Sequence, residues 1–112
     1  MIPALPVRAA GCAERSGKTV TLRASDFDPD VFVWDTKNRA IAYAANVPFV
    51  KVEDVLPHIV LAKAGTRAVV VGCNARIVRY HVTDAIGDAV LVRIASGPGR
   101  GRLGWVTSSD LR

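Results

Sequence analysis

The chain has 112 residues, of which 50% are hydrophobic, and a formal net charge of +5 at pH 7. This length suits one compact domain, or one small barrel with an N-terminal elaboration, and the apolar content excludes a disordered tail. No apolar run approaches the roughly 20 residues of a membrane-spanning helix, so we expect no membrane span. The positive charge favours contact with nucleic acid, anionic lipid or acidic polymers, and it serves solubility equally well.

Residues 1–15 predict a mobile N-terminal arm or the remnant of an export signal. The start is too short and too interrupted by proline to be a complete signal peptide, but Val7–Ala9 and Ala10–Cys12 resemble the end of one. We therefore expect an extracytoplasmic protein that is periplasmic, secreted or lipid-anchored. A cytoplasmic protein with a mobile N-terminus is the alternative interpretation.

The two cysteines, Cys12 and Cys73, fall one in each half of the chain and form no CxxC pair. With only two histidines beside them, at unhelpful spacings, the chain predicts no metal site. If the protein is exported, the even cysteine count predicts a disulfide between Cys12 and Cys73. Two buried or partly buried thiols are the other interpretation.

Alternation of apolar and polar residues predicts strands in residues 16–55, which we expect to form an N-terminal β extension. Thr19–Arg23 alternates after a glycine turn, and Asp30–Asp35 follows a proline. Residues 36–39 then predict a hairpin turn, which makes Arg39–Ala45 the return strand, although its alanines also permit a helix.

Further along, Glu53–Leu56 predicts a single helical turn that ends before Pro57, because the residue before a proline disfavours the helical conformation. Strand character resumes over residues 58–62.

Two glycine-containing turns mark the last part of the chain. Residues 65–72 read GTRAVVVG, and residues 101–111 read GRLGWVTSSDL. A Gly-Thr turn before an alternating strand, followed by a Gly-x-x-Gly-Trp-Val turn and a Ser-Ser-Asp-Leu tail, resembles the bacterial SH3 (SH3b) family over about residues 56–112. The chain departs from the family by an insertion over 73–88, by the lack of the aromatic usual ahead of the middle strand, and by an N-terminal half that matches nothing known to us.

The resemblance implies an SH3-like barrel with strands at 66–72, 89–94 and 102–107, a turn at 96–101 and a closing 3₁₀ turn at 108–111. It places Trp105 as a plug at one end of the barrel. The core residues that we expect are Val69, Val71, Val90, Val92, Ile94, Val106 and Leu111. The fold prediction is all-β: a small SH3-like barrel with an N-terminal β-hairpin that covers its open edge.

Few residues suggest chemistry. Asp26, Asp28 and Asp30 have the spacing that begins a calcium loop, but the sixth and twelfth positions of such a loop are Val31 and Lys37 instead of Gly and Glu. Cys73 and His81 could meet across a hairpin as a dyad, although neither histidine of the chain, His58 or His81, has a recognisable catalytic setting. We predict no enzymatic activity, no metal and no cofactor.

The sequence therefore favours a binding function. We expect an exported, non-catalytic SH3-like module that recognises a peptide or a cell-envelope polymer. The alternative is a basic small-barrel protein of the cytoplasm that binds nucleic acid, because basic residues on the glycine-rich turn at 97–102 could contact its backbone. The candidate ligand-binding residues are Trp34, Tyr80, Arg100, Arg102 and Trp105.

Overall fold

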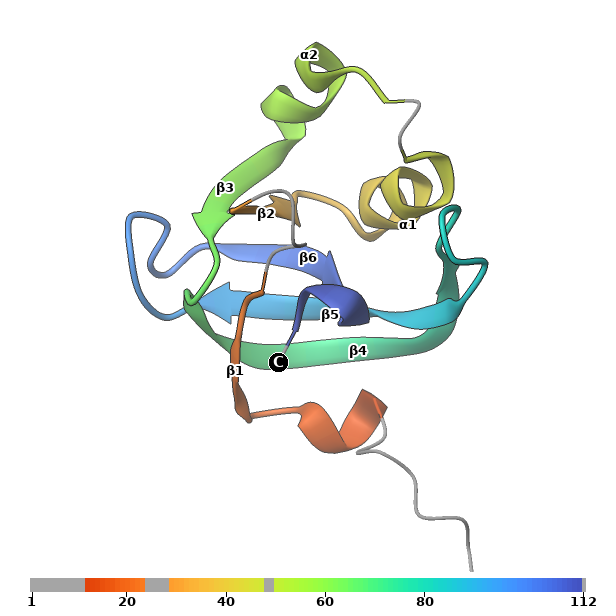
Figure 1. Ribbon diagram of the computed structural model, residues 1–112. Helices are drawn as coiled ribbons and strands as arrows, with labels where there is room; N and C mark the ends of the chain where they lie inside the picture. The colour runs from red at the N-terminus through yellow and green to blue at the C-terminus, as the bar shows by residue number, and fades with distance from the viewer. Residues whose placement is uncertain (1–11, 24–28, 48–49, 112) are drawn as a thin grey trace, which may run out of the picture.

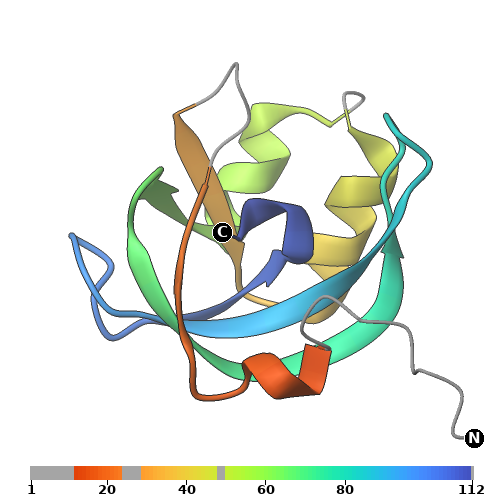
Figure 2. The ribbon, with the colours of Figure 1, turned by 60° about the horizontal axis from the view of Figure 1, so that its bottom comes forward.

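Six antiparallel strands form one strongly curled sheet in the computed structural model of the protein, which describes residues 12–23, 29–47 and 50–111. The strands are β1 (Thr19–Thr21), β2 (Asp30–Trp34), β3 (Ile59–Lys63), β4 (Arg67–Arg79), β5 (Ile86–Ile94) and β6 (Leu103–Thr107). Their order across the sheet is β1-β4-β5-β6-β2-β3, and the sheet curls into a half-barrel (Figure 1 and Figure 2). The predicted all-β class is confirmed.

Strands β4, β5 and β6 form an antiparallel meander, as the alternation of the sequence predicts. Val70 lies opposite Val92 but Gly72 lies opposite Leu91, so Val71 is the extra residue of a β-bulge. The bulge leaves Val71 43% exposed, and the buried residues of this strand segment are Ala68 and Val70. The prediction of Val69 and Val71 as core residues is therefore wrong, because a run of small and β-branched residues does not reveal which alternate set points inward.

Helices, and not a return strand, follow β2. Helix α1 (Lys37–Asn46) begins after Thr36, whose hydroxyl accepts a hydrogen bond from the backbone N–H of Arg39 at 3.3 Å. This N-cap and the following alanines favour a helix over the strand predicted for 39–45, which is wrong. The partner of β2 is instead β3, in which Val60 lies opposite Val33. Helix α2 (Val52–Val55) and the 3₁₀ helix η2 (Leu56–His58) lead into β3 and match the predicted helical turn.

The C-terminal residues close the open side of the sheet. The 3₁₀ helix η3 (Ser108–Asp110) follows β6, which confirms the predicted closing turn. Leu22, just after β1, forms a β-bridge with Leu111, and the backbone N–H of Arg23 donates to the carbonyl of Asp110 at 2.8 Å. Strand β1 pairs with β4, so both ends of the described chain meet beside the meander.

The interior of the half-barrel is a continuous apolar core, whose buried residues are Leu22, Val31, Val33, Ala62, Ala68, Val70, Val90, Val92, Ile94 and Val106. The partly buried Leu111 packs against them. Of the predicted core residues, Val90, Val92, Ile94 and Val106 are thus confirmed as buried. Burying each valine or isoleucine contributes roughly 1.5–3 kcal/mol relative to exposure, so this cluster contributes strongly to stability.

A disulfide joins the N-terminal part of the described chain to the meander. Cys12 opens the 3₁₀ helix η1 (Cys12–Arg15), which Figure 2 shows beside β4. Its sulfur is bonded to that of Cys73 in β4, with the two Cα atoms 5.5 Å apart. The predicted pairing is therefore present in the structure. None of the described helices has the length and apolar character needed to cross a membrane.

Candidate binding site

Strand β2 is buried on both of its faces, because successive side chains point to opposite sides of a sheet. Val31 and Val33 belong to the core of the half-barrel, whereas Phe32 and Trp34 point to the other face. There they form a second apolar cluster with residues of α1 and α2, including the fully buried Ala40. Helices α1 and α2 thus cover the aromatic face of β2 that points away from the interior of the half-barrel.

Three rings form the centre of this second cluster. The ring of Tyr43, from α1, lies 5.1 Å from that of Trp34 and 5.4 Å from that of Phe32, measured between centroids. The rings of Phe32 and Trp34 meet edge to face at 6.2 Å. Tilted and edge-to-face pairs are the favourable aromatic arrangements, so the three rings pack into one aromatic wall.

A cleft of about 510 Å³ lies on one side of this wall, and we call it the Tyr80 cleft. Trp34, Phe32 and Tyr43 contribute its aromatic side, and Tyr80, Val82 and Thr107 line it from the other elements. The hydroxyl of Tyr80 accepts a hydrogen bond from the backbone N–H of Ser109 at 3.0 Å, which ties the end of β4 to η3.

The position of the Tyr80 ring depends on a glycine in β5. A Cβ atom at Gly87 would lie 2.7 Å from the Tyr80 ring and 2.8 Å from its hydroxyl oxygen, so only glycine leaves room for the ring. Gly87 and Tyr80 lie on the two sides of the β4–β5 turn, so this end of the meander shapes the cleft.

Two carboxyl residues, Asp30 and Asp110, line the Tyr80 cleft, and Asp110 is the one in η3. Its Oδ2 accepts hydrogen bonds from the backbone N–H and the hydroxyl of Thr107, both at 3.2 Å, which caps η3. Burial raises the pKa of Asp110 above its ordinary value, although the two Thr107 hydrogen bonds and the charge of Arg23 act in the opposite direction. The oxygens of the Asp110 carboxylate can accept hydrogen bonds from a ligand.

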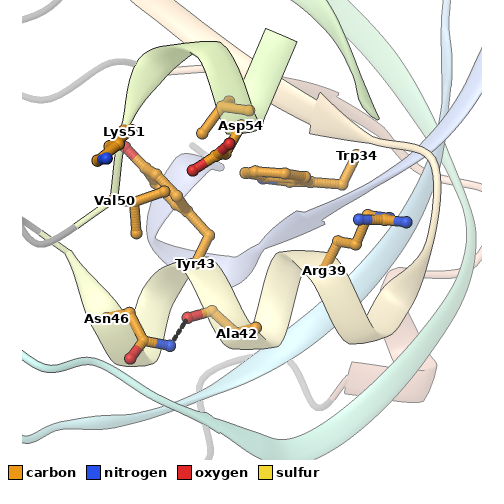
Figure 3. A pocket seen from close by; sticks show the side chains of 9 residues that line it. Trp34, Arg39, Ala42, Tyr43, Asn46, Val50, Lys51 and Asp54 are labelled. Carbon is orange, nitrogen blue, oxygen red and sulfur yellow. Dashed lines mark hydrogen bonds between the residues drawn. The ribbon is translucent and has the colours of Figure 1, made fainter. Parts of the chain in front are cut away.

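A second cleft of about 380 Å³ lies between α1 and α2, and we call it the Lys51 cleft (Figure 3). Trp34 and Tyr43 also line this cleft, so the ring pair separates it from the Tyr80 cleft. Its polar lining residues are Arg39, Asn46, Lys51 and Asp54.

Two of these polar residues are held in place by neighbours on or before α1. The Asn46 side chain donates to the carbonyl of Ala42 at 2.6 Å, and Arg39 forms an ion pair with Asp35 at 3.4 Å. The rim of the Lys51 cleft thus carries positively charged side chains, one carboxylate and one amide, and its other lining residues are mainly apolar. This combination suits an amphipathic ligand.

The structure brings some of the predicted ligand-binding residues together and separates others. Trp34 and Tyr80 line the same cleft, and Trp105 lies directly opposite Trp34 across the β2–β6 pairing. Trp105 belongs to the second cluster, with the ammonium of Lys37 5.8 Å from its ring centroid, so its predicted role as a plug of the barrel end is wrong. Arg100 and Arg102 are exposed on the β5–β6 hairpin, at the opposite end of the sheet from the β4–β5 turn (Figure 1).

Sequence reasoning missed Phe32, Tyr43 and Asp110 as site residues. A helix with its N-cap at Thr36 would have placed Tyr43 on the same face as the buried Ala40, three positions earlier. The signal was therefore present in the sequence, but the strand assigned to this segment concealed it.

The structure also places the residues of the predicted Cys–His dyad and of the calcium-loop spacing. Cys73 is bonded to Cys12, so it supplies no thiolate for a dyad with His81. The two sulfurs and the Asp88 carboxylate lie within 4.8 Å of one another, but the disulfide occupies the sulfurs. Of the aspartates with calcium-loop spacing, Asp26 and Asp28 lie outside the described residues, and Asp30 forms an ion pair with Lys63 at 3.7 Å.

Comparison of this chain with protein-family models, with curated proteins and with solved structures finds no match.

Proposed function

We propose that this chain is a non-catalytic binding module that recognises a peptide or a cell-envelope polymer through the clefts beside α1. The observation that carries the proposal is the pair of clefts, of about 510 and 380 Å³, on the two sides of Trp34 and Tyr43. Sites of such volume, with aromatic walls and a few polar groups, are typical of ligand binding. The rings would bury apolar parts of the ligand, and the polar rims would orient it.

The SH3b resemblance is part of this proposal. A three-stranded meander, a 3₁₀ helix and a closing bridge at Leu111 support an SH3-like barrel for the C-terminal half. In eukaryotic SH3 relatives a proline-rich ligand contacts a Pro and a Tyr of the closing segment. The matching positions here are Thr107 and Asp110, so we expect that the ligand of the clefts beside α1 is not a polyproline helix.

Export from the cytoplasm is the second part of the proposed function. The Cys12–Cys73 disulfide supports an oxidising compartment, since disulfides form and persist outside the cytoplasm. A module in the periplasm or on the cell surface would meet envelope polymers and peptides directly.

The test is to block one cleft and compare it with a neutral change on the same helix. Ala42 is exposed and lines the Lys51 cleft, whereas Ala45 is exposed on α1 and lines neither cleft. We expect Ala42→Trp to abolish sedimentation with insoluble peptidoglycan, or binding to peptides selected from a phage-displayed 12-residue library, while Ala45→Trp retains it. Equal binding by both variants would refute the site, and failure of both probes to bind the unaltered protein would refute the proposed ligand classes.

Nucleic-acid binding is the second candidate function, because Arg100 and Arg102 are both exposed on a glycine-rich hairpin. Guanidinium groups on such a hairpin can contact phosphates without reading sequence. Micromolar affinity for a DNA duplex that falls steeply with salt, and that Arg100→Ala with Arg102→Ala removes, would favour this function over the first.

A further inference from the structure

Strand β3 ends the sheet order, and among the described residues β2 is its only strand partner. The bonds that flank the β2–β3 ladder fix which peptide groups face outward. The backbone N–H of Asp35 donates to the carbonyl of His58 at 2.9 Å, and that of Ala64 donates to the carbonyl of Pro29 at 2.9 Å. Because hydrogen-bonded pairs alternate along an antiparallel ladder, residues 60 and 62 are the ones that bond to β2.

The alternate residues of β3 therefore direct their peptide groups away from β2. These are Ile59, Leu61 and Lys63, of which the Lys63 carbonyl already accepts from the N–H of Thr66 at 3.1 Å. The Leu61 side chain adds apolar surface to this edge, because the residue is 50% exposed.

A third cleft of about 370 Å³, which we call the hairpin cleft, lies along this edge. Residues 61–66 line one side of it, and residues 96–99 of the β5–β6 hairpin line the other, with Ile94 between them. The hairpin approaches β3 closely, since a Cβ atom at Gly99 would lie 3.0 Å from the Cγ1 of Val60. The edge of β3 is therefore accompanied by a pocket that could accept one side chain of an added strand.

The elements that border the hairpin cleft carry mainly positive charge. Lys63 ends β3 with its side chain 82% exposed, and Arg67, Arg100 and Arg102 are exposed on β4 and the hairpin. Asp30 is the one acid among the described lining residues, and it pairs with Lys63. Two copies of this edge would repel each other, whereas an acidic segment would be attracted.

We propose that the edge of β3 binds an extended acidic peptide as an added strand, with one apolar side chain of that peptide in the hairpin cleft. Strand addition takes its affinity from main-chain hydrogen bonds and its specificity from pockets for alternate side chains. This site shares only Asp30 with the Tyr80 cleft and no residue with the Lys51 cleft, so it does not rest on the function proposed above.

The experiment uses two synthetic peptides, one alternating glutamate with valine and leucine, and one in which lysine replaces every glutamate. Backbone amide exchange of the disulfide-bonded protein is followed by NMR with each peptide. We expect the acidic peptide alone to slow exchange at the amides of Ile59, Leu61 and Lys63, while those of Val60 and Ala62, already bonded to β2, change little. No change at the three outward amides, or an equal effect of the lysine peptide, would overturn the proposal.

A matched pair of variants tests the main-chain contact. Leu61→Pro removes an outward N–H, at the kind of edge position where proline is tolerated, and Leu61→Thr keeps it. We expect affinity for the acidic peptide to fall about tenfold more in Leu61→Pro than in Leu61→Thr, with unchanged thermal midpoints. Equal affinities of the two variants would also overturn the proposal. So would a dimer of the unaltered protein, measured by light scattering, that Leu61→Pro abolishes. If Leu61→Pro does not fold, the amide exchange decides alone.

Discussion

Trp34 lies directly opposite Trp105, and this pair is the register contact that joins β2 to β6. Through it the N-terminal half of the chain enters the same sheet as the C-terminal meander, because β2 lies between β6 and β3. The same tryptophan lines both clefts beside α1, so the contact that integrates the two halves also builds the candidate site.

The integration predicts that the C-terminal half does not fold alone. A chain that lacks residues 1–52 loses β1 and β2, which leaves β4 and β6 each with an unpaired edge and exposes core residues such as Val90. We expect an insoluble or molten product that lacks near-ultraviolet circular dichroism and binds a hydrophobic dye. A well-folded, monomeric fragment 57–112 would contradict this and make the N-terminal half a separate appendage.

Gly104 in β6 should tolerate no side chain. A Cβ atom there would collide with Cγ1 of Val33 and lie 2.9 Å from the carbonyl oxygen of Trp34. We expect Gly104→Ala to lower the free energy of unfolding by about 1–3 kcal/mol, measured by urea denaturation. The control is Gly72→Ala, whose Cβ would meet only the Leu91 side chain at 3.9 Å, in ordinary contact. Equal losses in the two variants would contradict the packing described for the β2–β6 contact.

Reduction of the Cys12–Cys73 disulfide should destabilise the fold. The bridge closes a loop with a sequence separation of 61, for which the chain-entropy relation predicts a loss of roughly 4 kcal/mol in the free energy of unfolding. Denaturation with and without reductant measures the loss. The control is the double variant Cys12→Ala, Cys73→Ala, whose free energy of unfolding should not change when reductant is added. Intact mass of protein from an oxidising compartment should show the loss of two hydrogens, whereas two freely alkylated thiols in the folded protein would contradict the bridge.

Asp110 should make the protein less stable as pH rises, whereas a carboxylate in an ion pair makes a protein more stable as pH rises. Burial raises its pKa in the folded protein above the ordinary 3.8, so the folded state binds this proton more tightly than the unfolded chain does. Its contribution to stability is thus fully present below the unfolded pKa and is lost as pH rises through the folded pKa.

The variant Asp110→Asn cannot ionise and lacks this contribution. We therefore expect the free energy of unfolding of the unaltered protein, minus that of Asp110→Asn, to decrease as pH rises from below 3.8 and then to level off. Urea denaturation at a series of pH values gives this difference. A difference that increases with pH would mean that the Thr107 hydrogen bonds outweigh burial.

The sequence predicts the meander well because its signals are local. Alternating β-branched residues mark β5 and β6, and the glycines of residues 96–101 mark the turn between them. The inward set in β4 was predicted wrongly at Val69 and Val71, because a run of small and β-branched residues does not show that Ala68 and Val70 are the set that points inward.

The site was harder to predict than the sheet. The alanines after Thr36 permit both helix and strand, so the N-cap at Thr36 is the local signal for the helix, and the aromatic face of β2 that α1 covers lies outside this segment of the sequence. The pairing of β2 with β6 and β3 is also non-local, since no turn signal links 30–34 to 103–107. Trp34 and Tyr80 were therefore identified as candidates from residue type alone, and the fold brings them to one cleft.

The most direct test of the central claim, that the clefts beside α1 bind the ligand, is NMR mapping of the disulfide-bonded protein. The probes are soluble peptidoglycan fragments and the peptides selected from the phage-displayed library. We predict that a bound probe shifts the indole N–H resonance of Trp34 and the amides of Tyr43 and Tyr80, and that Ala42→Trp removes the shifts. Shifts confined to the hairpin of Arg100 and Arg102, with the resonances of Trp34 and Tyr43 unchanged, would contradict the claim.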